Sequence, residues 1–341
     1  RVYPFEWVTL LGVLVAVVFL RSRGLRMDWR TAEYILAPLA PFLPKALLAG
    51  VGLVAAYRLG LAWLRRRRAR EALLGYLRRV ARPGWLALWL RLWLASMLMT
   101  YGYFWVKVTI PLVNPRLWDR GLWELDRWLH LGLSPTLFLT RLFEGSFLMR
   151  LLDGWYGWWV ASVFYSMAFF SALPRALPRR RFMLSCILLW TLGAWLYMAL
   201  PALGPTYLFP EVFRDVLPHM PSAELGQAAL WENYQKMLAG REGVLRQFNP
   251  TRGIAALPSL HVGAHWLFAL WARRLARPLW VLFVVATLLT FLGSILTGWH
   301  YAVDGYAGIL LAWGCYRLAL ALERPLAQAP TRRAGSAPPP A

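Results

Sequence analysis

The sequence predicts an all-α fold, a polytopic integral membrane helical bundle with about eight transmembrane helices. Of its 341 residues, 59% are hydrophobic and 16% are charged. The hydrophobic residues form continuous runs of about twenty, which is the helix length that crosses a hydrocarbon core of about 30 Å. A transmembrane β-barrel would instead alternate apolar and polar residues along strands of about ten. The runs therefore indicate membrane-spanning helices.

The net charge of +22 is concentrated at the ends of the apolar runs. RRRRAR (65–70) and ARRLAR (272–277), for example, each follow an apolar run. This is the positive-inside pattern of membrane proteins, and it also favours anionic lipid headgroups. We therefore expect the membrane bilayer to be the partner of these charges, and we expect no nucleic acid to bind.

The apolar segments divide the chain into an N-terminal part, a core and a tail. The first segment has no small-residue cleavage site after it, so we expect a span rather than a signal peptide. Residues 1–83 are expected to form N-terminal transmembrane helices with a basic loop, 84–322 the membrane core, and 323–341 a disordered tail rich in Pro and Ala. The expected helices are 5–20, 45–64, 84–106, 151–173, 182–203, 259–271, 278–297 and 301–322.

The arginine-rich connections predict the orientation of these helices. Placing the basic connections after the second, fourth and sixth helices in the cytoplasm makes all crossings alternate. The connections 21–44, 107–150 and 204–258 then face away from the cytoplasm. We therefore expect an integral protein of a bacterial-type inner (plasma) membrane, with His261 and His300 at its extracytoplasmic side.

The last apolar run carries two ionisable residues. SILTGWHYAVDGYAGILLAWG (294–314) has the composition of a span, yet it contains His300 and Asp304. An Asp at the middle of a lipid-facing helix costs about 2.5 to 3.5 kcal/mol, so such residues usually face a protein interior or a water-filled cavity. Positions i and i+4 share a helix face, so we expect the Asp304 carboxylate to hold the His300 ring. His261 begins another helix, which Ser259 is expected to cap.

Two histidines and a carboxylate at one membrane level suit nucleophilic catalysis at phosphorus. One histidine attacks, the carboxylate orients it, and the second histidine gives a proton to the leaving oxygen. His265 offers an alternative, because HVGAH, which begins at His261, has the helical spacing of two metal ligands. No Glu lies between these histidines to serve as a base. We therefore expect no metal and no other cofactor, with His265 packed on the helix face.

Four stretches of the chain carry a resemblance to a known family. GIAALPSLHVG (253–263) and GWHYAVDGYAG (298–308) resemble the second and third motifs of the type 2 phosphatidic acid phosphatase superfamily. The closest resemblance is to its inositol phosphorylceramide synthase branch. DRGLWELD (119–126) and ALGPTYLFP (202–210) resemble weaker landmarks of that branch.

The resemblance implies a fold and a mechanism. The fold would be a six-helix phosphatase-type catalytic core. His300 would attack phosphorus to form a phosphohistidine, Asp304 would orient it, and His261 would protonate the leaving group. The reaction would be metal-independent.

The chain departs from the superfamily pattern at the cations that hold phosphate. The first motif of the superfamily, a Lys and six residues before Arg-Pro, has no match within 211–258, and the Arg of its third motif is Ser294 here. A bound phosphate still needs cationic or N–H donors. The expected substitutes are Arg252 and Arg246, with Lys236 and Arg241 behind them.

A long connection precedes the helix that begins at His261. Residues 204–258 make about 55 residues, against two to eight between most packed helices. Many of them are apolar or aromatic, so we expect a cover that excludes water, with Tyr207 and Ser259 contacting the substrate. This cover and the branch resemblance favour transfer from a lipid phosphate or phosphodiester donor to a lipid alcohol, rather than to water.

Three alternatives remain open from the sequence. A lipid phosphate phosphatase would use the same residues with water as the acceptor. A transporter would use the histidines and Asp304 as a proton relay, although the chain has no internal repeat. A noncatalytic membrane scaffold would leave the matched histidines and Asp304 without a role.

Overall fold

The computed structural model describes residues 2–25, 37, 41–66, 68–239 and 249–323, and these contain helices and no strands. The predicted all-α class is confirmed. The helices are α1 (Pro4–Ser22), α3 (Phe42–Leu64), α4 (Ala69–Val80), α5 (Pro83–Val108), α6 (Ile110–Val113), α7 (Asp119–Leu129), α8 (Pro135–Phe143), α9 (Phe147–Gly157), α10 (Trp159–Ser171), α11 (Ala176–Ala199), α12 (Pro205–Leu208), α13 (Pro210–Phe213), η1 (Leu217–His219), α14 (Pro221–Ala239), α15 (Leu260–Ala272), α16 (Arg277–Leu296) and α17 (Ala302–Leu322).

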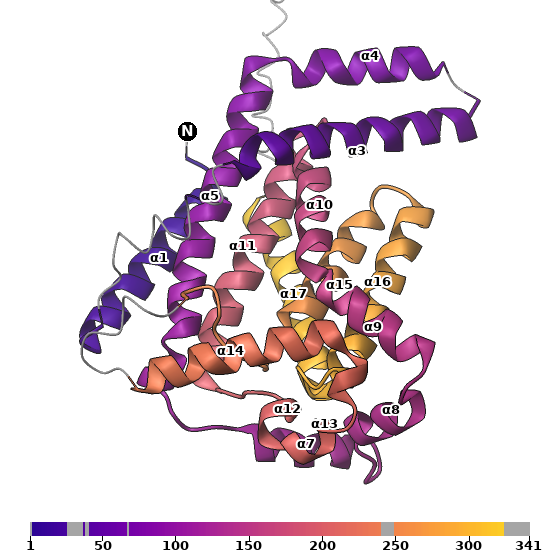
Figure 1. Ribbon diagram of the computed structural model, residues 1–341. Coiled ribbons are helices and arrows are strands. Elements are labelled where there is room, and N and C mark those ends of the chain that lie inside the picture. Colours follow the sequence, from indigo (N-terminus) through magenta and orange to yellow (C-terminus); the bar gives the residue numbers. More distant parts are fainter. Residues whose placement is uncertain (1, 26–36, 38–40, 67, 240–248, 324–341) are drawn as a thin grey trace, which may run out of the picture.

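An upright bundle carries further helices across both of its ends (Figure 1). Helices α5, α10, α11 and α15 to α17 run along the bundle, and α1 packs beside α5. Helices α3 and α4 lie side by side across one end. Helices α7, α8, α12 and α13 lie at the opposite end, and α14 crosses the bundle above them. The described parts of the two long connections predicted to lie on one side of the membrane, 107–150 and 204–258, therefore lie toward one end of the bundle.

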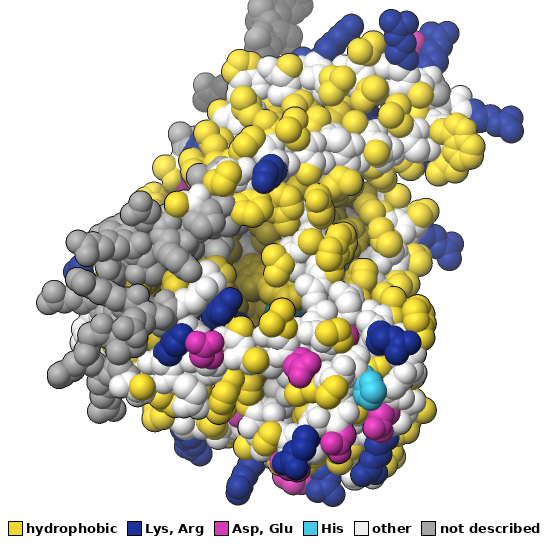
Figure 2. Space-filling model, in the orientation of Figure 1, with side chains coloured by type: hydrophobic (Ala, Val, Ile, Leu, Met, Phe, Trp, Pro, Cys, Tyr) yellow, Lys and Arg dark blue, Asp and Glu magenta, His cyan; other side chains and the backbone are white. Residues whose placement is uncertain are grey.

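Among the described helices, α1, α3, α11, α16 and α17 are long and apolar enough to cross a membrane by length and composition. Figure 2 shows apolar side chains over the middle of the visible face and Lys and Arg side chains mainly at its two ends. This distribution is typical of an integral membrane protein. The predicted tail, 323–341, lies outside the described residues except for Glu323, which is buried and pairs with Arg180 at 3.2 Å.

The expected helix 151–173 is divided in two. Helix α9 ends at Gly157 and α10 begins at Trp159, so the break falls on Trp158. Each half packs against different partners: α9 contacts α14 and α16, whereas α10 contacts α3, α11 and α15. Gly157 allows a close approach at the break, because a Cβ there would lie 3.0 Å from Cβ of Ser222. The sequence suggested one span because apolar composition is continuous across the break.

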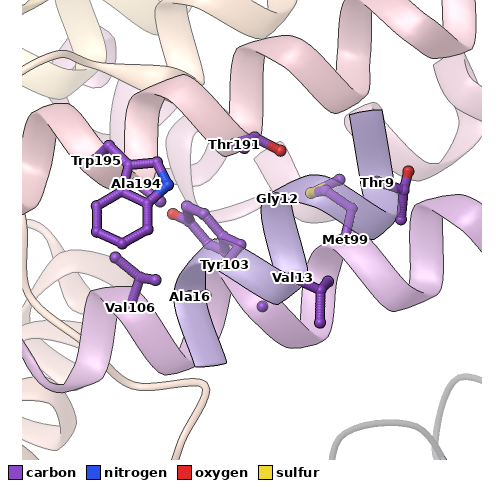
Figure 3. A pocket seen from close by; sticks show the side chains of 11 residues that line it. Thr9, Gly12, Val13, Ala16, Met99, Tyr103, Val106, Thr191, Ala194 and Trp195 are labelled. Atoms are coloured by element: carbon purple, nitrogen blue, oxygen red, sulfur yellow. The ribbon is translucent and has the colours of Figure 1, made fainter. Parts of the chain in front are cut away.

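Helix α1 packs against α5 and α11 through small residues (Figure 3). A Cβ on Gly12 would lie 3.1 Å from Cγ2 of Thr191, and a Cβ on Gly102 would lie 3.2 Å from Cγ2 of Val13. The hollow between these helices has a volume of about 10 Å³, which is at the lower limit for one water molecule. This interface therefore serves packing and offers no space for a substrate.

Two glycines bring the starts of α15 and α17 together. A Cβ on Gly308 would lie 2.2 Å from the carbonyl oxygen of Ser259, and a Cβ on Gly263 would lie 2.8 Å from that of Gly308. Any larger residue at Gly308 would push the two backbones apart. The Ser259 N–H also donates to the carbonyl of Asp304 at 2.8 Å. This contact fixes the helix that carries His261 against the helix that carries Asp304.

Candidate active site

His300 lies just before α17 and not on its first turn. Helix α17 begins at Ala302, and Gly298, at φ +72°, turns the chain out of α16. The His300 N–H donates to the carbonyl of Ser294 at 3.1 Å. The spacing of His300 and Asp304 predicted that they share one helix face. The structure corrects this arrangement, because the loop and the helix start bring the two side chains together.

Asp304 orients the His300 ring. Nδ1 of His300 lies 3.3 Å from Oδ2 of Asp304, which also accepts the N–H of Tyr301 at 2.9 Å. Both side chains are almost fully buried. In the tautomer that donates from Nδ1 to this carboxylate, His300 presents the lone pair of Nε2. Nε2 lies 3.1 Å from Nδ1 of His261, so the structure brings the three predicted residues together.

Tyr156 and Trp159 hold the second histidine. The Tyr156 hydroxyl lies 2.6 Å from Nδ1 of His261, and the ring centroid of Trp159 lies 4.1 Å from that of the imidazole in an edge-on arrangement. These residues come from α9 and α10, on either side of the break at Trp158. Sequence reasoning missed both, because aromatic residues in an apolar run are usually packing residues.

The histidines line a cavity of about 740 Å³. Its walls come from the end of α5, the break between α9 and α10, the near face of α14, and the segments before α15 and α17. Figure 2 shows the surface hollowed above α14, within the apolar part of the visible face. The walls mix ionisable with apolar groups, among them Lys107, Trp158, Trp159, Leu225, Leu230, Arg252, Ile254, His261 and His300.

Lys107 is a cavity residue that sequence reasoning missed. Its Nζ lies over the rings of Tyr103 and Tyr197, at 5.9 and 5.5 Å from their centroids. Its stem packs against Gly253, where a Cβ would lie 3.0 Å from Cγ of the lysine. In the part of the chain that the structure describes, no carboxylate forms an ion pair with Lys107 or Arg252. Among the described residues, Lys107 and Arg252 therefore line the cavity without a carboxylate partner.

Arg252, predicted to bind substrate, lines the cavity. Its carbonyl oxygen accepts the side-chain amide of Asn233 at 2.9 Å, and this contact ties the loop before α15 to α14. Arg246 and Arg241 lie outside the described residues. Lys236 pairs with Glu232 on the exposed face of α14.

Two other predicted substrate-binding residues do not line the cavity. Ser259 is fully buried, and its hydroxyl caps α15 by accepting the N–H of Val262. Tyr207 stacks on Trp231, and its hydroxyl donates to the carbonyl of Gln227 at 3.1 Å. Both side chains are used in packing and capping.

His265 is directed away from the histidine pair. Its Nδ1 lies 2.9 Å from the carbonyl oxygen of His261, and its Nε2 lies 2.9 Å from Oγ of Ser162. Both ring nitrogens thus have protein partners in the core. No group of three or more His, Cys, Asp or Glu among the described residues is placed to hold a metal ion.

The fold and the site define a helical membrane protein in which two histidines line one cavity and a buried aspartate contacts one of them. A model of the PAP2 superfamily matches residues 120–318, more than half of the chain, so the chain belongs to that superfamily. Comparison with curated proteins and with solved structures found no match. Membership supports an enzyme with phosphatase- or phosphotransferase-type activity on lipid phosphates in the bilayer. The matched range contains both histidines and Asp304 but not Lys107.

Proposed function

We propose that this protein is a membrane phosphotransferase that moves a phosphoryl or phosphoalcohol group from a lipid donor to a lipid alcohol through a phosphohistidine on His300. One observation carries the proposal. Nε2 of His300, oriented by Asp304, lies 3.1 Å from Nδ1 of His261 on the wall of a cavity that Lys107 and Arg252 also line, and neither of these pairs with a carboxylate among the described residues.

In the first step, Nε2 of His300 attacks phosphorus. The N–P bond forms as the P–O bond to the leaving alcohol breaks, and His261 gives its proton to that oxygen. Lys107 and Arg252 are the proposed contacts of the non-bridging phosphate oxygens, whose charge needs cationic donors. The Tyr156 hydroxyl orients the His261 ring. Arg246, outside the described residues, stays a predicted phosphate contact.

In the second step, the acceptor alcohol replaces the first product. His261 takes its hydroxyl proton, the oxygen attacks phosphorus, and the N–P bond to His300 breaks. Apolar walls such as Trp158, Leu225 and Ile254 favour lipid substrates at both steps. Helix α14 forms one wall of the cavity with Leu225 and Leu230, and an apolar wall favours an alcohol acceptor over water. The inositol phosphorylceramide synthase branch is the proposed relationship within the superfamily.

The proposed location of the site is the extracytoplasmic side of an inner membrane. The arginine-rich connections around α4 and between α15 and α16 support this orientation, because they lie at the end of the bundle opposite to α7 and α12. A cysteine introduced at Thr251, which is exposed beside the cavity, should react with a membrane-impermeant thiol reagent from outside intact cells. Labelling only after lysis would reverse the orientation.

The decisive experiment gives the purified protein a phosphorus-labelled lipid phosphate or phosphodiester donor with a panel of lipid alcohols. We expect a labelled lipid product whose formation depends on the alcohol. Free phosphate or phosphoalcohol as the sole product, at a rate that no alcohol changes, would contradict transfer and identify a lipid phosphatase.

A matched pair of histidine variants tests the nucleophile in the same assay. His300→Ala should abolish turnover, whereas His219→Ala should keep it, because His219 is exposed in η1. Near-parental turnover in folded His300→Ala would contradict the phosphohistidine mechanism and reopen the transporter and scaffold alternatives.

A further inference from the structure

Helix α7 carries two buried carboxylates on one face. Asp119 and Asp126 are seven residues apart, which is close to two helical turns, and they are only 1% and 2% exposed. Arg120, Glu124 and Arg127 are exposed on the remainder of the helix. The structure thus turns both aspartates of DRGLWELD (119–126) toward the bundle.

Asp126 holds the start of α17. Its two carboxylate oxygens accept the N–H groups of Ala302 and Val303, each at 2.7 Å. These are the first two residues of the helix, whose N–H groups have no partner within it. A carboxylate at this position also complements the positive end of the helix dipole. Asp126, on α7, thus caps α17, which begins two residues after His300.

Asp119 holds both sides of the His300 loop. It accepts the Tyr301 hydroxyl at 2.9 Å and the N–H of Gly204 at 2.8 Å. Gly204, at φ +102°, lies against Trp299, because a Cβ there would be 2.5 Å from the Trp299 carbonyl oxygen. The residues before and after His300 are therefore both connected to Asp119.

Keeping two carboxylates at these positions has a cost. Burial raises the pKa of Asp119, although its hydrogen bonds from Leu203, Gly204 and Tyr301 oppose this effect. Burial raises the pKa of Asp126 in the same way, against its bonds from Ala302 and Val303. Desolvation thus outweighs the hydrogen bonds in setting the pKa of both carboxyl groups.

We propose that Asp126 and Asp119 are positioning residues that fix His300 and Asp304 in the geometry for attack. His300 lies in a loop, so its ring is placed by its neighbours and by the first turn of α17. A displacement of about 1 Å in a reacting group can reduce a rate about 10²-fold. The inference rests on the proposed role of His300 as the nucleophile, and it adds α7 to the parts of the chain on which turnover depends.

The test compares kcat and KM of full-length variants with the labelled lipid donor. Asp126→Asn keeps the side-chain size but places an amide N–H against a backbone N–H donor. We expect kcat to fall about 10- to 100-fold while KM changes less than about threefold. Tyr301→Phe removes one bond to Asp119 without introducing a new polar group, and it should lower kcat about three- to tenfold in a protein that folds normally.

Ser134→Ala is the matched control. It removes the hydroxyl that caps α8 by accepting the N–H of Leu137 at 3.3 Å, away from His300. We expect its kcat and KM to equal those of the parent. The positioning role is overturned if Tyr301→Phe and folded Asp126→Asn both keep the parental kcat. It is also overturned if their only defect is a reduced yield of folded protein, equal to that of Ser134→Ala.

His300→Ala in the same series separates this inference from the proposed function. An inactive His300→Ala with parental Tyr301→Phe and Asp126→Asn would overturn the positioning role alone. An active, folded His300→Ala would overturn both.

Discussion

Two helices begin beside the cavity that His261 and His300 line, and a buried carboxylate from another helix caps each of them. Asp126 of α7 accepts the first two N–H groups of α17, both at 2.7 Å. Asp153 of α9 accepts the N–H groups of Ser222 and Ala223 at the start of α14, at 3.0 and 2.8 Å. The same capping chemistry thus serves the helix that begins just after the proposed nucleophile and the helix that forms one wall of the cavity.

The surroundings of the two helix starts differ. The start of α17 is further fixed by Asp119 through Tyr301 and by the contact between Ser259 and the carbonyl of Asp304. Helix α14 packs mainly against α9, α6 and η1, and Gln227 connects it to the His300 loop by a bond of 2.6 Å to the carbonyl of Thr297. We infer that substitutions at the start of α17 lower the rate of the chemical step, whereas substitutions at the start of α14 weaken substrate binding.

The largest effect is expected at the first turn of α17. Asp304→Asn removes the charge that orients His300 and places an amide beside Nδ1, so we expect kcat to fall about 10²- to 10⁴-fold. Single-turnover kinetics with the labelled donor would measure the loss in the chemical step. A kcat within threefold of the parent, in a folded variant, would show that the carboxylate is not part of the machinery.

The second-largest effect is expected at Lys107, which lies on the cavity wall that α5 contributes. Lys107→Met keeps most of the stem but removes the cation, so we expect kcat/KM to fall about 10²- to 10³-fold, as for the loss of one charge-stabilising donor. Lys45→Met is the control, because Lys45 is exposed on α3. Equal activity of the two variants would exclude Lys107 as a phosphate contact.

A smaller effect is expected at α14. Asp153→Asn weakens one cap, which is worth about 1 kcal/mol, so we expect KM to rise about three- to tenfold with kcat within twofold. Steady-state kinetics over a range of donor concentration would separate the two parameters. If kcat falls instead, as expected for Asp126→Asn, the two helix starts have the same role and the comparison fails.

Excess EDTA is expected to have no effect on either parameter. The proposed steps use imidazoles and cationic side chains, and the histidine pair has Asp304 and Tyr156 as its other partners. Activity measured before and after chelation tests this expectation. Loss of activity with recovery on adding Zn²⁺ would favour the metal-ligand interpretation of HVGAH.

The fold class and the meeting of His261, His300 and Asp304 could be predicted from the sequence for a physical reason. Apolar runs of about twenty residues specify membrane helices, and ionisable residues in such runs need an interior partner. The spacing of His300 and Asp304 indicated their contact, although a loop and a cap supply it instead of one helix face.

The remaining parts of the site depend on which way each helix faces. Lys107 and Tyr156 lie in α5 and α9, far from the motifs in sequence, and no local pattern directs them to the cavity. Asp126 has the pattern of an amphipathic surface helix, which does not reveal that its polar side chain caps another helix. Tyr207 fitted an expected cover, yet tertiary packing directs its ring onto Trp231.

The most direct test of the account is to trap the intermediate on His300. The full-length protein is mixed with a phosphorus-labelled lipid donor, quenched with alkali within one turnover, and digested. We predict an acid-labile, alkali-stable label on the peptide that contains His300, absent from His300→Ala and present in His219→Ala. A label on another residue, or turnover in His300→Ala with no labelled peptide, would contradict the central claim.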